Sequence, residues 1–151
     1  AAAEKRAEEL RAARQVFEKR RGVAIIVQRG TKVLTCLRLK CRDMNGRWQF
    51  GGGAVEQGET TEQAAYRELE EETGMLARSV KYLCDTFGYT PEGDPMWTSF
   101  FVANCDGYEP QNNEPERHGP WEWVEIDELL TRPIIDVMRP ALAAMAAKGA
   151  E

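Results

Sequence analysis

The sequence predicts one mixed domain of the α/β or α+β class, preceded by a helical extension at the N-terminus. The chain has 151 residues, the usual length of one domain, and its 42% hydrophobic and 30% charged residues are typical of globular proteins. Short apolar or alternating runs, which indicate strands, interleave with segments of helical pattern. Because no internal repeat or linker is evident, we expect residues 22–151 to form one domain and residues 1–21 to form the extension.

The extension is predicted to be a polar helix over residues 4–20. Alanine and charged residues dominate this segment, and its narrow apolar stripe consists of Leu10, Val16 and Phe17. A helix with so little apolar surface is more typical of an extension that lies on a domain than of a core element. Gly22 is expected to end it.

Three strands and a glycine loop are predicted in the first part of the domain. Residues 23–27 are almost wholly apolar, which indicates a buried strand, and residues 33–40 alternate as a second strand. Residues 29–31 supply the turn between these two strands, and residues 41–46 form a loop. Residues 48–50 predict a brief strand, and the three glycines that follow it, residues 51–53, predict a loop.

The clearest helix in the sequence spans residues 60–73. Thr60 and Gln63 form a capping box at its start, and Gly74 stands where a helix would end. We expect this helix to pack on a sheet through apolar side chains, namely Ala65, Leu69 and Leu76.

The second half of the domain predicts three strands and two helices. Residues 79–90 and 96–105 are rich in residues that favour strands, and residues 91–95 have strong turn chemistry between them. Residues 110–115 form a loop, and residues 121–125 alternate as a further strand. Asp127 opens a short helix, and residues 136–148 form the closing helix.

Composition excludes several classes of function. With 25 acidic and 20 basic residues the formal net charge is −5, which disfavours a protein that coats nucleic acid through a basic face. His118 is the only histidine, and the cysteines form no C-x-x-C pair, so the usual zinc sites lack their ligands. A catalytic triad would have to depend on His118 alone, in a loop rich in Pro, Asn and Glu.

The same residues suggest a cellular environment. The four cysteines have irregular spacing and predict free thiols in a reducing compartment: Cys36, Cys41, Cys84 and Cys105. No apolar run approaches the ~20 residues that a membrane helix needs, so no membrane partner is expected. We therefore expect an intracellular protein of the cytoplasm, with mitochondria as the alternative because the sequence does not begin with methionine.

The carboxylates of the predicted helix 60–73 are concentrated on one face. Glu68, Glu71 and Glu72 stand at i, i+3 and i+4, whereas Glu70 points elsewhere into solvent. A solvated acidic face is the plain interpretation. The triple glycine and the turn before the helix favour another, because clustered carboxylates beside exposed backbone are what a hard cation such as Mg²⁺ requires.

A longer motif surrounds these glutamates. From Gly53 to Met75 the sequence resembles the Nudix box, G-x5-E-x7-R-E-U-x-E-E-x-G-U with U aliphatic, and all nine constrained positions over 23 residues are filled. The rest of the chain, about residues 22–148, is similar to that family in the order of its elements. The resemblance implies an α/β/α sandwich around a mixed sheet, and a hydrolase that cleaves a nucleoside diphosphate linked to another group X.

The resemblance also implies roles for the residues of the box. Glu71 and Glu72 resemble the ligands of Mg²⁺, with Mn²⁺ as the alternative ion, and Glu68 resembles a further ligand or the base that deprotonates the attacking water. The carbonyl of Gly52 often completes the metal ligands in relatives. Since carboxylates alone repel a pyrophosphate, a divalent ion would bridge the two and polarise a phosphoryl oxygen.

Other positions of the box are expected to be structural. Arg67 would pair with Glu59 and hold the glutamate face in place, while Gly53 and Gly74 fill the glycine positions of the motif. Relatives usually have Pro-Gly-Gly before the box, whereas this chain has Gly51 in place of the proline. The substitution is expected to make this segment more flexible before folding.

Four residues outside the box are candidates for the site. Arg38 is similar in position to an arginine that touches substrate phosphates in many Nudix enzymes, and Lys40 is a weaker candidate for that contact. Glu116 is favoured over Glu114 as an extra metal ligand, because an E-P-E loop before a W-E-W-V strand is typical of the nucleoside triphosphate pyrophosphohydrolases of the family. Trp97 could stack on a base. For each, the alternative is an ordinary surface or packing role.

Three functions stay open. The first is a MutT-like pyrophosphohydrolase that converts a nucleoside triphosphate to a monophosphate and pyrophosphate. The second is an RNA 5′-end pyrophosphohydrolase, in which the N-terminal helix tracks phosphates through its basic residues, Arg11, Arg14, Lys19, Arg20 and Arg21. The third is a Nudix module that binds without turnover, although none of the box glutamates is missing. The N-terminal helix could also contact a protein partner or a second copy of the chain.

Overall fold

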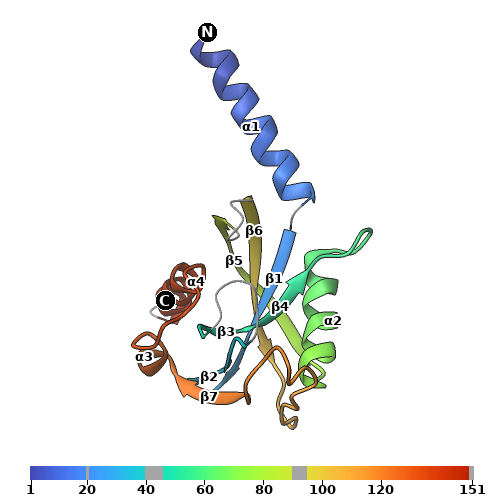
Figure 1. Cartoon of the computed structure of the whole chain (residues 1–151), viewed down its shortest axis with the longest axis vertical. Helices are drawn as coiled ribbons and strands as arrows, with labels where there is room; N and C mark the ends of the chain where they lie inside the picture. Colours follow the sequence, from blue (N-terminus) through green and yellow to red (C-terminus); the bar gives the residue numbers. More distant parts are fainter. Residues whose placement is uncertain (20, 40–45, 90–94, 150–151) are drawn as a thin grey trace.

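The computed structural model describes residues 1–19, 21–39, 46–89 and 95–149, with the side chains of residues 13–19 and 149 left aside. Figure 1 shows a central sheet with helices on both faces and one helix standing apart at the N-terminus. The elements in chain order are α1 (Ala2–Lys19), β1 (Arg21–Arg29), β2 (Lys32–Leu37), β3 (Trp48–Gln49), β4 (Gly51–Ala54), α2 (Thr61–Thr73), β5 (Ser79–Tyr89), β6 (Pro95–Asn104), β7 (Glu122–Glu125), α3 (Ile126–Leu129) and α4 (Met138–Gly149).

The sheet is mixed and has β1 at its centre. Its strand order is β3-β2-β1-β6-β5, with β4 paired to β1 and β7 paired to β2. Strands β1 and β6 run parallel, whereas β1 is antiparallel to both β2 and β4. On the edge of β1 opposite β6, residues 22–25 pair with β4 and residues 28–29 pair with β2. β4 and β2 therefore share one edge of β1, and α2 is the next element after β4 in the chain.

Alternate residues of the central strands serve two separate cores. Val23 and Ile25 of β1 are buried against Leu69 of α2 on one face. Ile26 lies in the other core, which includes Leu142 of α4. Because the side chains of a strand alternate between faces, one apolar run can bury both layers of helix. The predicted α/β/α sandwich is therefore confirmed.

Most predicted elements are present, with shifted ends. The second strand ends at Leu37 and not at residue 40, and the closing helix begins at Met138 and not at residue 136. The predicted loop over residues 41–46 and the turn over residues 91–95 lie almost wholly outside the described residues. Of the cysteines, Cys36, Cys84 and Cys105 are free thiols, as predicted, and Cys41 is outside the described part.

The glycine run forms a strand and not the expected loop. Gly51–Ala54 make up β4, which pairs with β1 so that Gly52 lies opposite Ala24. A Cβ built on Gly52 would collide with the carbonyl oxygen of Val23 and the Cα of Ala24. The close approach of two backbones, and not a turn, thus explains glycine at this position.

Helix α2 begins and ends as its sequence predicts. Thr60 caps the helix, its side chain accepting from the backbone N–H of Gln63 while the Gln63 side chain accepts from the Thr60 N–H. Gly74 adopts the left-handed conformation with φ 72°. The prediction that Leu76 packs on the sheet is wrong, because Leu76 is 47% exposed. Met75, which directly follows the helix cap, is buried in its place.

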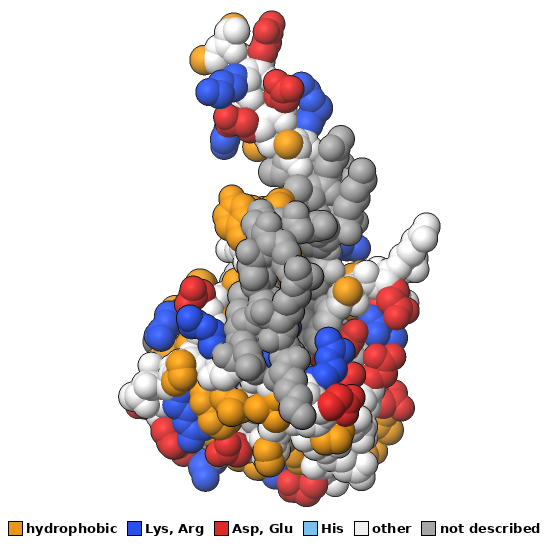
Figure 2. All heavy atoms as spheres, viewed as in Figure 1, with side chains coloured by type: hydrophobic (Ala, Val, Ile, Leu, Met, Phe, Trp, Pro, Cys, Tyr) orange, Lys and Arg blue, Asp and Glu red, His pale blue; other side chains and the backbone are white. Residues whose placement is uncertain are grey.

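Helix α1 does not lie on the domain as expected. Figure 1 shows it pointing away from the sheet and joining β1 at its C-terminal end. Acidic and basic side chains cover its first three turns, as Figure 2 shows, and Leu10 is 54% exposed. A helix with so little apolar area gains little from burial against the sheet. Among the described residues, no helix has both the length and the apolar character that crossing a membrane requires.

Candidate functional site

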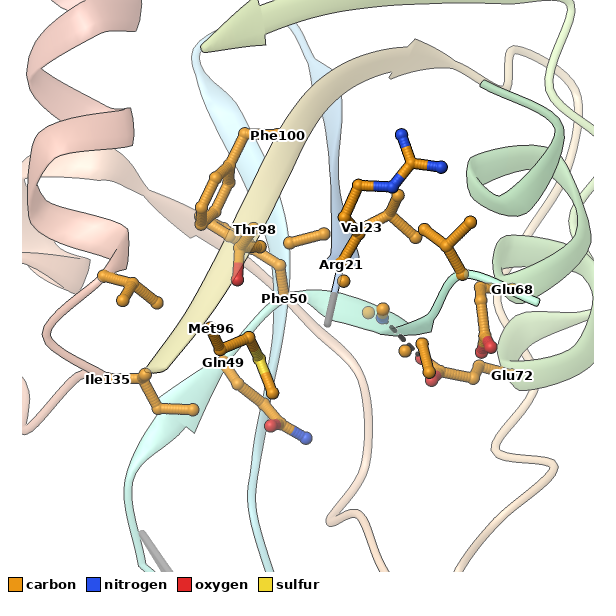
Figure 3. Close-up of a pocket in the computed structure, with 18 of the residues that line it drawn as sticks. Arg21, Val23, Gln49, Phe50, Glu68, Glu72, Met96, Thr98, Phe100 and Ile135 are labelled. Carbon is orange, nitrogen blue, oxygen red and sulfur yellow. Dashed lines mark hydrogen bonds between the residues drawn. The ribbon is translucent and has the colours of Figure 1, made fainter. Parts of the chain in front are cut away.

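The candidate site is a cavity of about 880 Å³ between α2, β4 and the central strands. Figure 3 shows that it has two different ends, with Glu68 and Glu72 of α2 at one and Phe100 and Ile135 at the other. Its lining comes from parts of the chain that are far apart in the sequence, including Arg21, Arg38, Gln49, Phe50, Gly51, Gly52, Gly53, Arg67, Glu68, Glu71, Glu72, Met96, Thr98, Phe100, Glu114, Arg117, His118 and Met138.

Arg67 organises the acidic end. Its Nε donates to Glu59 at 2.7 Å and one of its terminal nitrogens donates to the other Glu59 oxygen at 2.9 Å, which makes a bidentate pair. Its second terminal nitrogen donates to Glu68 at 2.9 Å and Glu71 at 3.1 Å. The hydrogen bonds from Arg67 lower the pKa of Glu59 to about 2. The predicted Arg67–Glu59 pair is thus present and positions two of the three box carboxylates.

Glu72 is the most buried of these carboxylates, with only 5% of the residue exposed. Its Oε2 accepts from the backbone N–H of Gly52 at 3.1 Å, the dashed line in Figure 3. Its pKa is raised to about 8, chiefly by burial; the Gly52 hydrogen bond acts against this rise, and the nearby charges of Glu68 and Glu114 contribute to it. Burial likewise raises the pKa of Glu68. A carboxylate held away from water beside others is a fit for a divalent cation, which favours the ionised form.

The glycines of β4 create the space for these carboxylates. A Cβ on Gly53 would overlap the carboxylate of Glu68, and one on Gly51 would lie 2.9 Å from Glu72 Oε2. The glycine positions 51 and 53 are therefore matched to the two glutamates of α2 that face them. The expected role of Gly52 is also compatible with its position, because its N–H is bound to Glu72 while it lines the cavity.

The loop before β7 brings a further carboxylate to the site, and it is Glu114. Glu114 lines the cavity, whereas Glu116 is exposed and lies outside the lining. Single ligand atoms of Glu72, Glu114 and His118 all lie within 4.8 Å of one another. The geometry therefore favours Glu114 in place of the predicted Glu116. The sequence motif contains both Glu114 and Glu116, and it does not tell which of the two side chains points into the cavity.

Sequence reasoning missed His118 as a site residue. It is 7% exposed, and its Nδ1 lies 3.8 Å from Glu114 Oε2, too far for a hydrogen bond. Burial lowers the pKa of this histidine, so its neutral form is favoured. Its spacing of four residues from Glu114 is the one sequence signal that could have pointed to it.

Arginines from several parts of the chain line the cavity. Arg38 lines it, as predicted for a phosphate contact, and its guanidinium donates to Gln49 Oε1 at 3.0 Å. Arg21 and Arg117 also line the cavity and were not predicted. Lys40, the weaker candidate, is outside the described residues. Positive charge beside the carboxylates makes the cavity suited to a phosphate chain.

The opposite end of the cavity is mostly apolar and does not include Trp97. Met96 and Thr98 of β6 face the cavity, and since side chains alternate, Trp97 points to the other face, where its ring lies 4.9 Å from that of Phe87. The prediction that Trp97 stacks on a base is therefore not supported. Phe50, Phe100 and the exposed Tyr89 supply the aromatic surface of the cavity instead.

Comparison with known proteins places this geometry in a family. A model of the NUDIX domain matches residues 18–145. The oxidized purine nucleoside triphosphate hydrolase of Danio rerio is 36% identical over 109 residues, which cover 71% of this chain and 66% of that protein. An RNA pyrophosphohydrolase of Acinetobacter baylyi is 32% identical over 95 residues, covering 51% of this chain and 57% of that protein. The chain thus spans between about half and two thirds of these curated relatives.

A solved structure agrees over a longer range. The crystal structure of a MutT NUDIX hydrolase from Burkholderia pseudomallei superposes with a TM-score of 0.76 and 29% identity, covering 83% of this chain and 96% of that one. The family model, the box on α2 and β4, and this superposition lead to the same conclusion: the chain belongs to the Nudix hydrolase family.

Proposed function

We propose that this chain is a metal-dependent pyrophosphohydrolase that converts a nucleoside triphosphate to a nucleoside monophosphate and pyrophosphate. The observation that carries the proposal is the polarity of the cavity, which has carboxylates and arginines at one end and apolar side chains at the other. A nucleotide has the same division, because its phosphate chain is charged and its base is flat and largely apolar on its faces. Several curated relatives are named as hydrolases of nucleoside triphosphates, which supports this substrate class.

The metal ligands in this proposal are carboxylates of α2 and the loop before β7. Glu71, Glu72 and Glu114, with Glu68 as a further ligand and the carbonyl of Gly52, would hold Mg²⁺ or Mn²⁺. When bound, the ion would neutralise the phosphate charge and polarise a phosphoryl oxygen. Glu72 fits this role because its buried carboxylate, at a pKa of about 8, gains most from a nearby cation.

Glu68 is the proposed general base. The N–H of Arg67 fixes one of its carboxylate oxygens at 2.9 Å, while burial raises its pKa and so makes it a better proton acceptor. In the proposed reaction Glu68 accepts a proton from the attacking water, whose oxygen forms a new bond to phosphorus. The P–O bond of the anhydride between the α- and β-phosphates breaks, which releases the nucleoside monophosphate and pyrophosphate. Arg67 is a positioning residue, since it holds Glu68 and Glu71 while paired to Glu59.

The arginines of the cavity are proposed to hold the phosphate chain. Arg38 and Arg117 line the cavity, and Arg21, which also lines it, lies at the start of β1. Each guanidinium can donate to two phosphate oxygens at once, which fixes the chain in position and offsets its charge. Met96, Phe100 and Ile135 would then contact the base.

The test is a screen of nucleoside triphosphates with Mg²⁺, read as released pyrophosphate, on wild-type protein and Glu72→Gln. We expect the variant to lose turnover by about a hundredfold or more, because a lost metal ligand removes several kcal/mol of transition-state stabilisation. Glu70→Gln is the matched control, since Glu70 is exposed on the same helix and outside the cavity lining. Near-normal turnover by Glu72→Gln would refute the proposal.

A second candidate is hydrolysis at the 5′ end of an RNA. It is favoured by the similarity to RNA pyrophosphohydrolases, including one of Erythrobacter litoralis that is 30% identical over 129 residues. A comparison of 5′-triphosphorylated RNA with free nucleotides at equal concentration separates the two substrates. Binding of nucleotides without release of any phosphate product, across both panels, would instead favour a module that does not catalyse.

A further inference from the structure

The imidazole of His118 lines the cavity, and the glutamate chemistry does not use it. His118 is the only histidine in the chain and is 7% exposed. Its Nδ1 is fully buried and has no hydrogen-bond partner among the described residues. A buried polar atom without a partner is unfavourable, and a ligand bound to this nitrogen would remove that cost.

The surroundings of this nitrogen indicate which ligand. Ligand atoms of His118, Glu72 and Glu114 all lie within 4.8 Å of one another. An ion bound at roughly 2.1 Å from each ligand places opposite ligand atoms roughly 4.2 Å apart, so small side-chain rotations suffice to enclose one. The three groups come from two separate parts of the chain, because Glu72 is on α2 and the other two are in the loop before β7.

We propose that His118 is a nitrogen ligand of the metal site and makes this site select first-row transition ions over Mg²⁺. Mg²⁺ takes oxygen ligands, whereas first-row transition ions also bind imidazole nitrogen, with an affinity that is lowest for Mn²⁺ and higher for Co²⁺ and Zn²⁺. A site of carboxylates alone discriminates weakly between Mg²⁺ and Mn²⁺. One imidazole nitrogen beside Glu72 and Glu114 shifts that balance toward the transition ion.

The opposing explanation is that His118 only positions Glu114. The ring is packed beside Trp121, with ring centroids 5.8 Å apart, and its Nδ1 faces the Glu114 carboxylate. A positioning role would affect the binding of every metal ion to the same degree. The ratio of two affinities therefore separates a ligand from a positioning residue.

The first experiment measures the binding of Mn²⁺ and Mg²⁺ by calorimetry, without nucleotide, on protein purified without a histidine tag. His118→Asn keeps an amide N–H near the place of Nδ1 but supplies no imidazole nitrogen. We expect its Mn²⁺ affinity to fall roughly tenfold or more, while its Mg²⁺ affinity changes by less than roughly twofold. Equal losses for both ions, or no loss for Mn²⁺, overturn the proposal.

A second experiment needs no variant. Because the chain has one histidine, ¹⁵N labelling of histidine gives a single imidazole in the NMR spectrum. Titration with Zn²⁺ is expected to move one ring nitrogen to the resonance of a metal-bound imidazole at one equivalent of ion. Unchanged ring resonances at saturation overturn the proposal.

The inference rests on the proposed function because it concerns the same metal site, but the two fail in different ways. Both experiments detect the ion and not a product. If Mn²⁺ binds through His118 and no nucleotide is hydrolysed, the proposed function fails and the ligand assignment stands. If nucleotides are hydrolysed and the Mn²⁺ to Mg²⁺ affinity ratio is unchanged by His118→Asn, the ligand assignment fails and the proposed function stands.

Discussion

At the scale of single residues, Glu72 shows how the site is prepared for a cation. A carboxylate that is 5% exposed and close to Glu68 and Glu114 would normally be replaced by an uncharged group. The single hydrogen bond from the Gly52 N–H does not offset this cost, as the raised pKa of about 8 indicates. The residue is therefore unfavourable in the metal-free protein and becomes favourable when a cation is bound.

The stability of the metal-free protein should accordingly fall as pH rises. Below the ordinary pKa of 4.5 the Glu72 carboxyl is protonated in both folded and unfolded chains; from there to about pH 8 only the folded chain keeps the proton. Wild-type protein should lose about 2–4 kcal/mol of unfolding free energy across this range, and Glu72→Gln should lose much less. Urea unfolding in EDTA at pH 5, 6.5 and 8 measures the difference.

Added metal ion is the control for that prediction. Binding of a divalent ion requires the ionised carboxylate, so saturating Mn²⁺ should raise the stability of the wild type more at pH 8 than at pH 5. The variant should show little of this pH dependence. Parallel pH profiles for wild type and Glu72→Gln in EDTA would contradict the assigned role of burial.

The loop before β7 offers a matched pair of carboxylates. Glu114 lines the cavity and Glu116 is exposed outside it, although both belong to the same short motif. Glu114→Gln should weaken Mn²⁺ binding by about tenfold and reduce turnover, whereas Glu116→Gln should leave both within about twofold of the wild type. Calorimetry and initial rates on the two variants decide which glutamate is the ligand, and a larger effect at Glu116 would restore the assignment predicted from sequence.

At the scale of elements, the site depends on the fit of α2 against β4. Arg67 of α2 donates to the backbone carbonyl of Ala54 at 3.0 Å, and the N–H of Gly52 donates to Glu72 at 3.1 Å. These two bonds fix the helix to the strand at Gly52 and Ala54. The absence of side chains on Gly51 and Gly53 allows Glu72 and Glu68 to approach the backbone.

Alanine substitutions in β4 should separate stability from catalysis. Gly52→Ala should lower the unfolding free energy by about 1–3 kcal/mol, because the new Cβ collides with the backbone of Val23 and Ala24, which cannot move aside. Gly53→Ala should displace the Glu68 carboxylate, which is more mobile than a backbone, and so reduce turnover more than stability. Urea unfolding and initial rates report the two effects.

Gly22→Ala is the matched control for these variants. Gly22 pairs with Ala54 in the same sheet, and a Cβ there would find its nearest atom at 3.5 Å, an ordinary contact. Its effect on stability should stay well below that of Gly52→Ala. Similar losses for Gly22→Ala and Gly52→Ala would show that the collision of the Gly52 Cβ with β1 is not the cause of the lost stability.

At the scale of the whole molecule, the formal net charge of −5 hides an uneven distribution. Five carboxylates and four guanidinium groups line the cavity. The carboxylates are those of Glu56, Glu68, Glu71, Glu72 and Glu114, and the guanidinium groups are those of Arg21, Arg38, Arg67 and Arg117. A phosphate substrate therefore meets an environment in which a bound divalent ion leaves net positive charge. The acidic total is no obstacle to a nucleotide.

Helix α1 should be dispensable for the hydrolysis of free nucleotides. It stands away from the sheet, and the cavity lining begins at Arg21. Removal of residues 1–19 should change the melting temperature by less than about 4 °C and kcat/KM for a nucleotide by less than about twofold. Thermal unfolding and steady-state rates test this, with RNA as a second substrate.

The RNA substrate makes that truncation informative about the alternative function. If α1 tracks the phosphates of an RNA, its removal should lower activity on a 5′-triphosphorylated RNA while activity on nucleotides is kept. Equal effects on both substrates would mean that α1 has no part in substrate choice. A large decrease in melting temperature after removal of α1 would instead show that the helix stabilises the fold.

The sequence by itself determined the elements and the box, because these depend on local patterns. Thr60, Gln63 and Gly74 predict the ends of α2 correctly, since capping is decided within a few residues. The resemblance to the Nudix box also implied the pair of Arg67 and Glu59, and the structure contains it. The apolar run at residues 23–27 likewise identified the central strand.

Only the tertiary structure decided which side chains meet across distant segments. The direction in which a side chain points decides whether it lines the cavity. Glu114 lines it and Glu116 does not, and Met96 and Thr98 line it while Trp97 does not. The same holds for His118, which lies beside Glu72 and Glu114. A shift of one residue reverses that direction in a strand, and no local pattern fixes it in a loop. The glycines of β4 were misread as a loop for the same reason, since the backbone of β1 that requires them lies about thirty residues away in the sequence.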